Sequence, residues 1–497
     1  MSALPDDVIL GARAERGAPA ASYALPVPRD ARARLARGWL WLGLAALLGS
    51  GLFALLLVLA RAPYTQALFP WMDFFRTALV VHVDLSVLVW FVAFGGVLWS
   101  LNSTARWLAL GRAALGLGAA GAALVAIAPF LGDGHPLMSN YIPVLRQPAF
   151  LLGLVLFALG TLLVVLRAMV AIPPVGPYID GAAALRFGLN AAAVATLLAL
   201  GAFGWSFMAL PASMEATAYY ELLFWGGGHV LQFTYTLLLL VAWVWLADAS
   251  GLALAASPRV MLVLFGLGLG VVFFVPLVYY THPVGSAEHV ILFTWLMRYG
   301  GSLATLPLAL LMVLALVRGT PARGSAKALR AALLASILLF GAGGGIGFLI
   351  RGSDVTIPAH YHGAIVGVTL AFMGLTYHLL PRLGYGAVDA RWAARQPWLY
   401  GGGQFLHVFG LLISGGYGVA RKVAGAEQGL DGLGRIVGMG LMGLGGLIAI
   451  AGGAVFVAVV LRALAGGPGF NRADARAPRS SIARAAGSGR KTQESGT

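Results

Sequence analysis

The chain is a series of long apolar runs separated by short segments rich in Arg, Gly and Pro. Each run reaches the roughly 20 residues that an α-helix needs to cross a bilayer. Because an open sheet edge in lipid leaves backbone groups unpaired, the runs are expected to be helices. We therefore predict an all-α polytopic membrane bundle of about twelve transmembrane helices, at 39–61, 75–101, 107–131, 147–171, 185–211, 219–248, 259–281, 290–317, 326–350, 359–381, 399–420 and 434–463.

Two basic, polar tails flank this core of residues 39–463. Residues 1–38 show no apolar signal-peptide region and no small-residue cleavage site. Residues 464–497 are rich in Gly, Ala, Arg and Ser. Both tails are expected to be disordered and to carry no catalytic domain.

Positive charge predicts the orientation of the bundle. Arginines and lysines gather in the N-terminal tail, in the loops 317–330 and 382–398, and in the C-terminal tail. The positive-inside rule then places both termini in the cytoplasm, in a bilayer expected to be a bacterial inner membrane. The net charge of +15 follows from this bias, so it predicts no nucleic-acid partner. The exceptions, expected on the outer side, are Arg61, Arg76, Arg146, Arg351, Arg421, Lys422 and Arg435.

Composition narrows the chemistry. The chain contains no cysteine, which excludes disulfides, iron–sulfur clusters, thiolate metal sites and covalently attached c-type haem within it. Histidine is therefore the best soft metal ligand available.

Five histidines lie in or beside four different apolar runs at a similar expected depth, in the outer third of the membrane. They are His82, His229, His282, His360 and His362. An ionisable side chain within a span is costly unless it is paired or coordinated, so the shared depth predicts metal binding. His360 and His362 point roughly 200° apart on one helix and cannot bind the same metal through adjacent faces. That helix is predicted to stand between two metal centres.

Three segments resemble subunit I of the heme-copper oxidase superfamily. PAHYHGAIVGVTLAFMGLTYHLLPRLG (358–384) is similar to its tenth helix, LLFWGGGHVLQF (222–233) to its sixth and HVDLSVLVWFVAFGG (82–96) to its second. The likeness extends over the twelve-span core, about 39–463, and rests more on histidine placement than on extended identity.

The resemblance implies two haems and one non-haem metal, with copper expected. His82 and His362 would be the axial ligands of a low-spin haem that transfers electrons. His360 would hold a high-spin haem with an open far side, and His229 and His282 would bind the metal facing it. Arg421 and Lys422 suit haem propionates, for which they would be charged donors.

Two departures from the oxygen-reducing pattern concern the metal pocket. The family has two consecutive histidines where this chain reads His282-Pro283, so His289 or Glu288 could complete the ligand set, with Glu221 a further oxygen donor. Phe233 stands where many oxygen reductases carry a tyrosine that donates an electron and a proton to O2. Nearby tyrosines do not match the pattern; they are Tyr235, Tyr279 and Tyr280.

The eighth span carries a polar seam that could admit protons from the outer side. Thr294, Arg298, Ser302 and Thr305 follow helical spacing, whereas residues 306–317 contain nothing polar. Arg298 is interpreted as a pairing partner of Glu288 or of a propionate. His135, His378 and His407 are interpreted as interfacial or hydrogen-bonded residues rather than ligands.

These features predict a membrane oxidoreductase that reduces a small oxidised gas. Reduction of O2 to water is placed first because it prevails in the family, and reduction of NO to N2O stays open on the missing tyrosine. The lack of cysteine means that electrons must enter from a partner subunit, a cytochrome c or a cupredoxin. A non-catalytic haem subunit also stays open, as does a transporter, although no internal repeat is evident.

Overall fold

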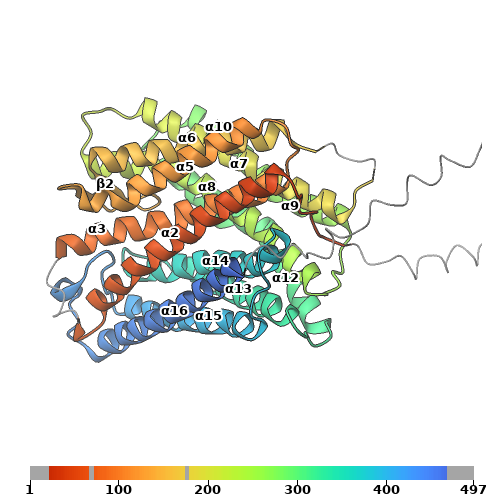
Figure 1. The fold of residues 1–497 in the computed structure, drawn as a ribbon. Coiled ribbons are helices and arrows are strands. Elements are labelled where there is room, and N and C mark those ends of the chain that lie inside the picture. Colours follow the sequence, from red (N-terminus) through yellow and green to blue (C-terminus); the bar gives the residue numbers. More distant parts are fainter. Residues whose placement is uncertain (1–21, 66–71, 174–177, 467–497) are drawn as a thin grey trace, which may run out of the picture.

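Helices make up nearly all of the structure, a computed structural model that describes residues 22–65, 72–173 and 178–466 (Figure 1). The elements are α2 Ala31–Arg61, α3 Met72–Val83, η3 Asp84–Val89, α4 Trp90–Leu101, α5 Leu108–Ile127, η4 Ala128–Phe130, β1 His135–Leu137, β2 Val144–Arg146, α6 Pro148–Val170, α7 Gly181–Ala209, α8 Ala216–Ala249, α9 Pro258–Gly270, η5 Val271–Phe274, α10 Val275–Thr281, α11 Ala287–Trp295, η6 Leu296–Gly300, α12 Gly301–Arg318, α13 Ala326–Gly347, α14 Thr356–Arg382, α15 Ala390–Gly416, η7 Gly425–Gln428 and α16 Leu433–Ala465. The all-α bundle expected from the apolar runs is confirmed.

The spans match the predicted number closely. Among the described residues, eleven helices are long and apolar enough to cross a membrane, and α15 adds a twelfth rod of 27 residues. The α15 helix falls outside the apolar set because it carries Gln404, His407 and a run of glycines. Four spans are not single α-helices, because α3–η3–α4, α5–η4, α9–η5–α10 and α11–η6–α12 each contain a π or 3-10 turn.

The start of the described chain is more ordered than expected. The first helix begins at Ala31, capped by the Asp30 side chain, which accepts from Arg32 N–H at 2.8 Å. Before it, Tyr23 is buried: its N–H donates to Asp248 and its hydroxyl to the Ala256 carbonyl. Burial and the Asp248 charge raise the pKa of Tyr23 to about 12. The predicted tail boundary at residue 38 was therefore wrong, whereas residues 1–21 and 467–497 lie outside the described part.

A small hairpin marks one end of the bundle. Strands β1 and β2 pair antiparallel with His135 opposite Arg146, and we call this end the hairpin end (Figure 1, left). The described chain begins and ends at the opposite end, as α2 starts and α16 finishes there. An even number of spans requires this arrangement, which agrees with the expectation that both termini share one side.

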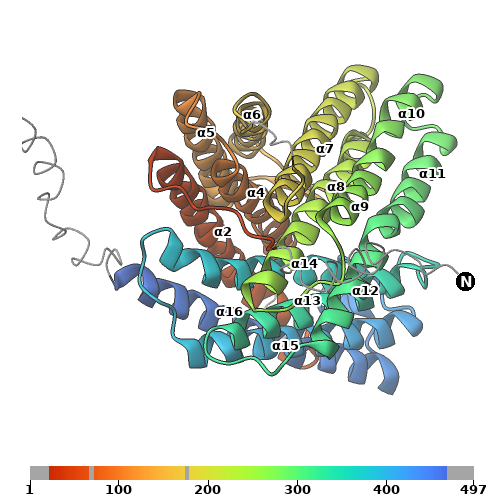
Figure 2. The same cartoon turned by 90° about the vertical axis from the view of Figure 1, so that its right-hand side faces the viewer.

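Two helices form the centre of the bundle. Within an 18-residue apolar stretch of each span, the share buried inside the protein is 94% for α8, 83% for α14 and 67% for the span 74–101, against 33% for several outer spans. Figure 2 shows α14 between the α8 side and the α13, α15 and α16 group. His229, His360, His362 and His82 lie on these three most enclosed spans. The candidate ligands thus occupy the protein interior rather than the lipid-facing surface.

Glycines let α15 and α16 approach closely. A Cβ atom at Gly410 would meet the backbone nitrogen of Met442, and one at Gly445 would meet the backbone nitrogen of His407. Small residues at such contacts allow helices to associate in lipid through van der Waals packing. This packing fixes the position of His407, which lies on α15 beside α14.

Most of the outer-side arginines for which the structure gives contacts have partners at the hairpin end. Arg76 pairs with Glu427 at 3.4 Å and Arg435 with Asp431 at 2.6 Å. Arg61 donates to the side-chain oxygen of Gln428 at 3.4 Å. These contacts join the loop after α15 to α2, α3 and α16. The arginines at the hairpin end therefore have a structural role, although they depart from the positive-inside pattern.

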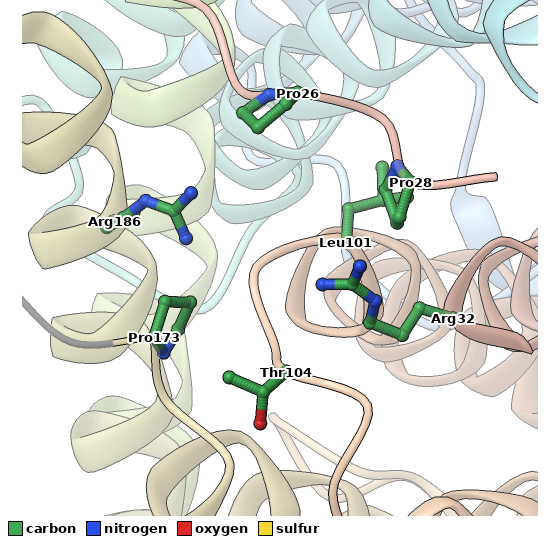
Figure 3. Close-up of a pocket in the computed structure, with 7 residues that line it drawn as sticks. All are labelled: Pro26, Pro28, Arg32, Leu101, Thr104, Pro173 and Arg186. Carbon is green, nitrogen blue, oxygen red and sulfur yellow. The ribbon is translucent and has the colours of Figure 1, made fainter. Parts of the chain in front are cut away.

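A pocket of about 180 Å³ lies at the opposite end, between the start of α2, the end of α4 and α7 (Figure 3). Two of its lining residues are Arg32 and Arg186. Arg32 is held by Asp30 and the Ser103 carbonyl, and Arg186 by Asn102. No histidine lines this pocket, so it lies apart from the candidate ligands.

Replacing Gly410 by leucine is expected to destabilise the bundle, because its side chain would meet the α16 backbone directly. Overpacking of this kind typically costs about 1–3 kcal/mol. Gly402→Leu on the same helix is the control, since a Cβ there meets nothing within 4 Å. Thermal unfolding of the detergent-solubilised protein measures both, and equal midpoints would contradict the close approach.

Candidate metal and haem site

The imidazole of His82 is fixed by α2. Its Nδ1 lies 3.0 Å from the Ser50 carbonyl oxygen and 2.9 Å from the Ser50 hydroxyl. A carbonyl only accepts hydrogen bonds, so the ring proton is on Nδ1 and Nε2 of the neutral ring is left as a donor atom for a metal. The π turn η3 begins two residues later, a feature that often marks functional sites.

His362 lies in a cluster with His82 and His407. Its ring centroid is 4.7 Å from that of His407, and the ring of His82 lies nearby. His407 donates from Nδ1 to the Met442 carbonyl at 2.8 Å. The interpretation of His407 as a hydrogen-bonded residue fits this contact, yet the residue also borders the candidate low-spin haem ligands.

His360 faces the other side of α14. Its Nδ1 donates to the Gly343 carbonyl at 2.7 Å, which again leaves Nε2 unprotonated. Gly347 lies against the same ring, where a Cβ would be only 2.8 Å from Nδ1. The glycines of α13 therefore admit this ring, and His360 and His362 contact different neighbours, as their spacing predicts.

His229 is held at both ring nitrogens. Nδ1 donates to the Trp225 carbonyl at 2.7 Å, and Nε2 lies 2.8 Å from the hydroxyl of Tyr141. Tyr141 belongs to the turn between β1 and β2. The hairpin thus places a phenol at the one nitrogen of His229 that is available to a metal.

The second histidine beside His229 is His289. It is fully buried, and both of its ring nitrogens lack a hydrogen-bond partner within the described chain. Its ring packs on Phe293 at 5.0 Å, and the ring of His229 packs on the same Phe293 at 5.9 Å. A buried imidazole without partners is costly, so one nitrogen of His289 suits a metal shared with His229.

The other expected ligands lie less favourably. His282 is the residue directly after α10, half-buried, and its charge reaches His289. Glu288 is exposed on α11, away from the buried rings. Within the ranges that the structure describes, no three His, Cys, Asp or Glu side chains come together as a metal-binding group. A three-histidine set is therefore not assembled, although the residues present fit a metal held by fewer imidazoles.

A polar network at the hairpin end anchors the turn that carries Tyr141. Asn140 donates from its backbone and side chain to Glu221, and its side-chain oxygen accepts from Arg421 at 2.8 Å and Lys422 at 3.2 Å. Lys422 also donates to the Met138 carbonyl. Glu221 is thereby engaged with the hairpin and not with His229.

Arg421 and Lys422 contact only neutral acceptors and form no ion pair with a carboxylate of the described residues. Burial, and next the charge of Arg421, lower the pKa of Lys422 to about 8, while Glu221 opposes the shift. Two cations held together without a carboxylate fit a carboxylate-bearing ligand such as a haem propionate.

The polar seam of the eighth span does not line an interior path. Thr294, Ser302 and Thr305 each donate to a carbonyl of their own helix. Thr294 and Arg298 are exposed, and the Arg298 guanidinium lies 5.4 Å from the ring of Phe348. The pairing expected between Arg298 and Glu288 was wrong, because the guanidinium reaches across to the end of α13.

The remaining expectations concern residues away from the pocket. Phe233 is buried and carries no hydroxyl toward His229. His378 packs on Trp245 at 6.1 Å, and His135 is exposed on β1. Asp84 is buried with both carboxylate oxygens unpartnered in the described chain.

Sequence reasoning missed Tyr141, because a search for histidines at one depth does not examine loops. A signal was present in the glycine run 226–228 before His229. Cβ atoms on these glycines would meet Tyr279, Phe203 and Tyr141 in turn. Three consecutive glycines beside a candidate ligand indicate that bulky groups approach the helix there.

Comparisons with known proteins agree with this geometry. The family model described as cytochrome c and quinol oxidase polypeptide I matches residues 34–448. An uncharacterized protein of Rickettsia prowazekii is 29% identical, covering 78% of this chain and 88% of its own length. One of Aquifex aeolicus is 29% identical, covering 70% and 85%. A heme-copper terminal oxidase solved as a dimer has a TM-score of 0.66 at 17% identity, covering 88% of this chain and 84% of its own.

Asn140→Ala is expected to loosen the hairpin, because Arg421 and Lys422 lose their bonds to the Asn140 side chain and Glu221 keeps only the bond from the backbone N–H. Hydrogen bonds to charged groups are worth about 1.5–3 kcal/mol each when well shielded, and less in this exposed setting. Hydrogen exchange of the amides in 135–146 measures the change. Ser353→Ala, which removes a single bond to Arg421, is the control; unchanged exchange in Asn140→Ala would refute the anchoring role.

Proposed function

Because this chain belongs to the heme-copper oxidase family, as cytochrome c and quinol oxidase polypeptide I, we propose that it is the catalytic subunit of a respiratory terminal reductase. Its membership makes it an integral membrane protein of an oxidoreductase family that binds haems and a further metal. The proposal adds the reaction: electrons pass through a low-spin haem to a haem and non-haem-metal pair that reduces O2 to water.

One observation carries the proposal. His82, His229 and His360 each donate Nδ1–H to a backbone carbonyl within the three most enclosed spans. This leaves Nε2, the metal-binding nitrogen, as the atom presented to the interior. A histidine that binds a metal through Nε2 usually donates its Nδ1–H to a backbone carbonyl or a carboxylate. The same arrangement at three buried histidines therefore matches metal binding.

The residues have separate tasks in this account. His82 and His362 hold the low-spin haem, His360 the high-spin haem, and His229 with His289 the non-haem metal. His289 replaces His282 as the second metal ligand, because its buried nitrogens are unpartnered. When bound, the haems and metal supply electron storage and a gas-binding position; the chain orients the imidazoles and excludes water around them.

Entry of electrons requires a partner. The chain has no cysteine for a copper pair or a c-type haem, so a partner subunit, a cytochrome c or a cupredoxin would deliver electrons near the hairpin end. We propose that this end faces outward from a bacterial inner membrane and that both termini are cytoplasmic.

Nitric oxide reduction is the second candidate, favoured by Phe233. Joining two NO molecules to form N2O needs no O–O bond cleavage, so the lack of a phenol four residues after His229 matters less. Side-by-side consumption of O2 and NO by the purified complex with a reduced donor separates the two reactions. Turnover of neither gas, with no CO-induced change in the haem spectrum, would leave only an electron-transfer subunit.

His289→Ala is expected to remove most of the non-haem metal while the low-spin haem spectrum stays intact, because His82 and His362 lie on other helices. Metal analysis per haem measures this result. His378→Ala is the matched control, since that buried histidine packs on Trp245 instead. Full metal content in His289→Ala would exclude it as a ligand.

Haem retention is expected to weaken as pH rises past about 8, the pKa of Lys422, because the lysine holds a propionate only when protonated. The pKa of Lys422 in the folded protein lies below the usual lysine value of 10.5, so the neutral form dominates above about 8 and propionate binding must then take up a proton. Lys422→Arg should remove this dependence, since arginine stays charged. Haem loss to apomyoglobin across pH 7–10 tests it; identical profiles would argue against contact with Lys422.

A further inference from the structure

The metal pocket lacks a third nitrogen donor. His229 and His289 share Phe293, while Glu288 is exposed and Glu221 is bound to the hairpin. In the described part of the chain no trio of His, Cys, Asp and Glu forms a metal-binding group. A third protein donor must therefore come from another residue type or from a movement of His282.

Tyr141 supplies an oxygen at the required place. Its hydroxyl lies 2.8 Å from Nε2 of His229, and the other nitrogen of that ring is committed to the Trp225 carbonyl. A metal on Nε2, with a bond of about 2.0 Å, would occupy the direction that the hydroxyl takes here. To bind a metal at that nitrogen, the hydroxyl would have to swing aside while staying next to Nε2.

The phenol is held by more than this one bond. The Tyr141 ring packs edge-on against Trp225, with centroids 5.8 Å apart, and lies over Gly228, where any side chain would collide with it. Asn140, the preceding residue, is tied to Glu221, Arg421 and Lys422. Because Nδ1 of His229 carries the ring proton, the Tyr141 hydroxyl is the donor in its bond to Nε2.

We propose that the hydroxyl oxygen of Tyr141 is the third protein donor to the non-haem metal, together with His229 and His289. This rests on the proposed function, since it assumes a metal at these imidazoles. Coordination exchanges the O–H bond for an oxygen–metal bond and releases the proton to solvent. Two imidazoles with one oxygen suit a divalent first-row metal such as copper.

The test compares single-hydroxyl variants of the purified holo-complex. Tyr141→Phe keeps the ring and removes the donor oxygen; Tyr377→Phe, the control, removes a similarly buried hydroxyl bonded to Gln396. Non-haem metal per haem is measured during titration with a chelator. Loss of a ligand partner costs at least 10–100-fold in metal affinity, so Tyr141→Phe should release metal at chelator levels lower by that factor. Tyr377→Phe should match the unmodified protein.

A second measurement separates a donor from a residue that only fixes the His229 ring. Resonance Raman spectra of the oxidised protein are expected to contain phenolate modes that vanish in Tyr141→Phe and persist in Tyr377→Phe. Retained metal affinity together with absent phenolate modes would overturn the proposal. Loss of the metal in His282→Ala with retention in Tyr141→Phe would assign the third position to His282 instead.

The outcomes also distinguish this inference from the proposed function. If the unmodified complex contains two haems and the metal but Tyr141→Phe behaves as wild type, only the Tyr141 assignment fails. If the unmodified complex binds no non-haem metal, the terminal-reductase proposal itself fails.

Discussion

The two-residue spacing of His360 and His362 on α14 is the constraint on which the rest of the site depends. Residues two apart on a helix point to different sides, so one rigid element presents two imidazoles to two regions. His360 meets α13 at Gly343, and His362 meets α15 at His407. In the proposed function, this well-buried helix would separate the electron-transfer haem from the reaction site by its own width.

Three of the candidate ligands, His82, His229 and His360, depend on a backbone carbonyl from the surrounding packing. Inside a membrane bundle, a ring N–H without an acceptor is costly, and the carbonyls of Ser50, Trp225 and Gly343 provide the acceptors. The acceptors of His82 and His360 come from neighbouring helices, and that of His229 from the preceding turn of α8. Close helix packing through small residues therefore controls the chemistry, because it sets which nitrogen of each ring remains unprotonated.

The sequence was sufficient for the fold and for locating the candidate histidines on their helices. Apolar run length determines the spans, and histidine placement identified the three helices that are the most enclosed. It was insufficient where side chains from loops meet the pocket. His282 was preferred over His289 as a metal ligand because it stands where the family has two consecutive histidines. In the structure, His289 is the buried one, and its ring nitrogens have no partner in the described chain. Tyr141 was missed because the hairpin reaches His229 across 88 residues, a contact that no periodicity encodes.

The most direct test of the account is a cryo-EM map of the complex purified from membranes with its native cofactors. The account predicts one macrocycle between His82 and His362 and a second on His360, with a separate metal density beside His229. A map in which α14 packs directly against side chains at both histidines, without macrocycle density on either side, would contradict it.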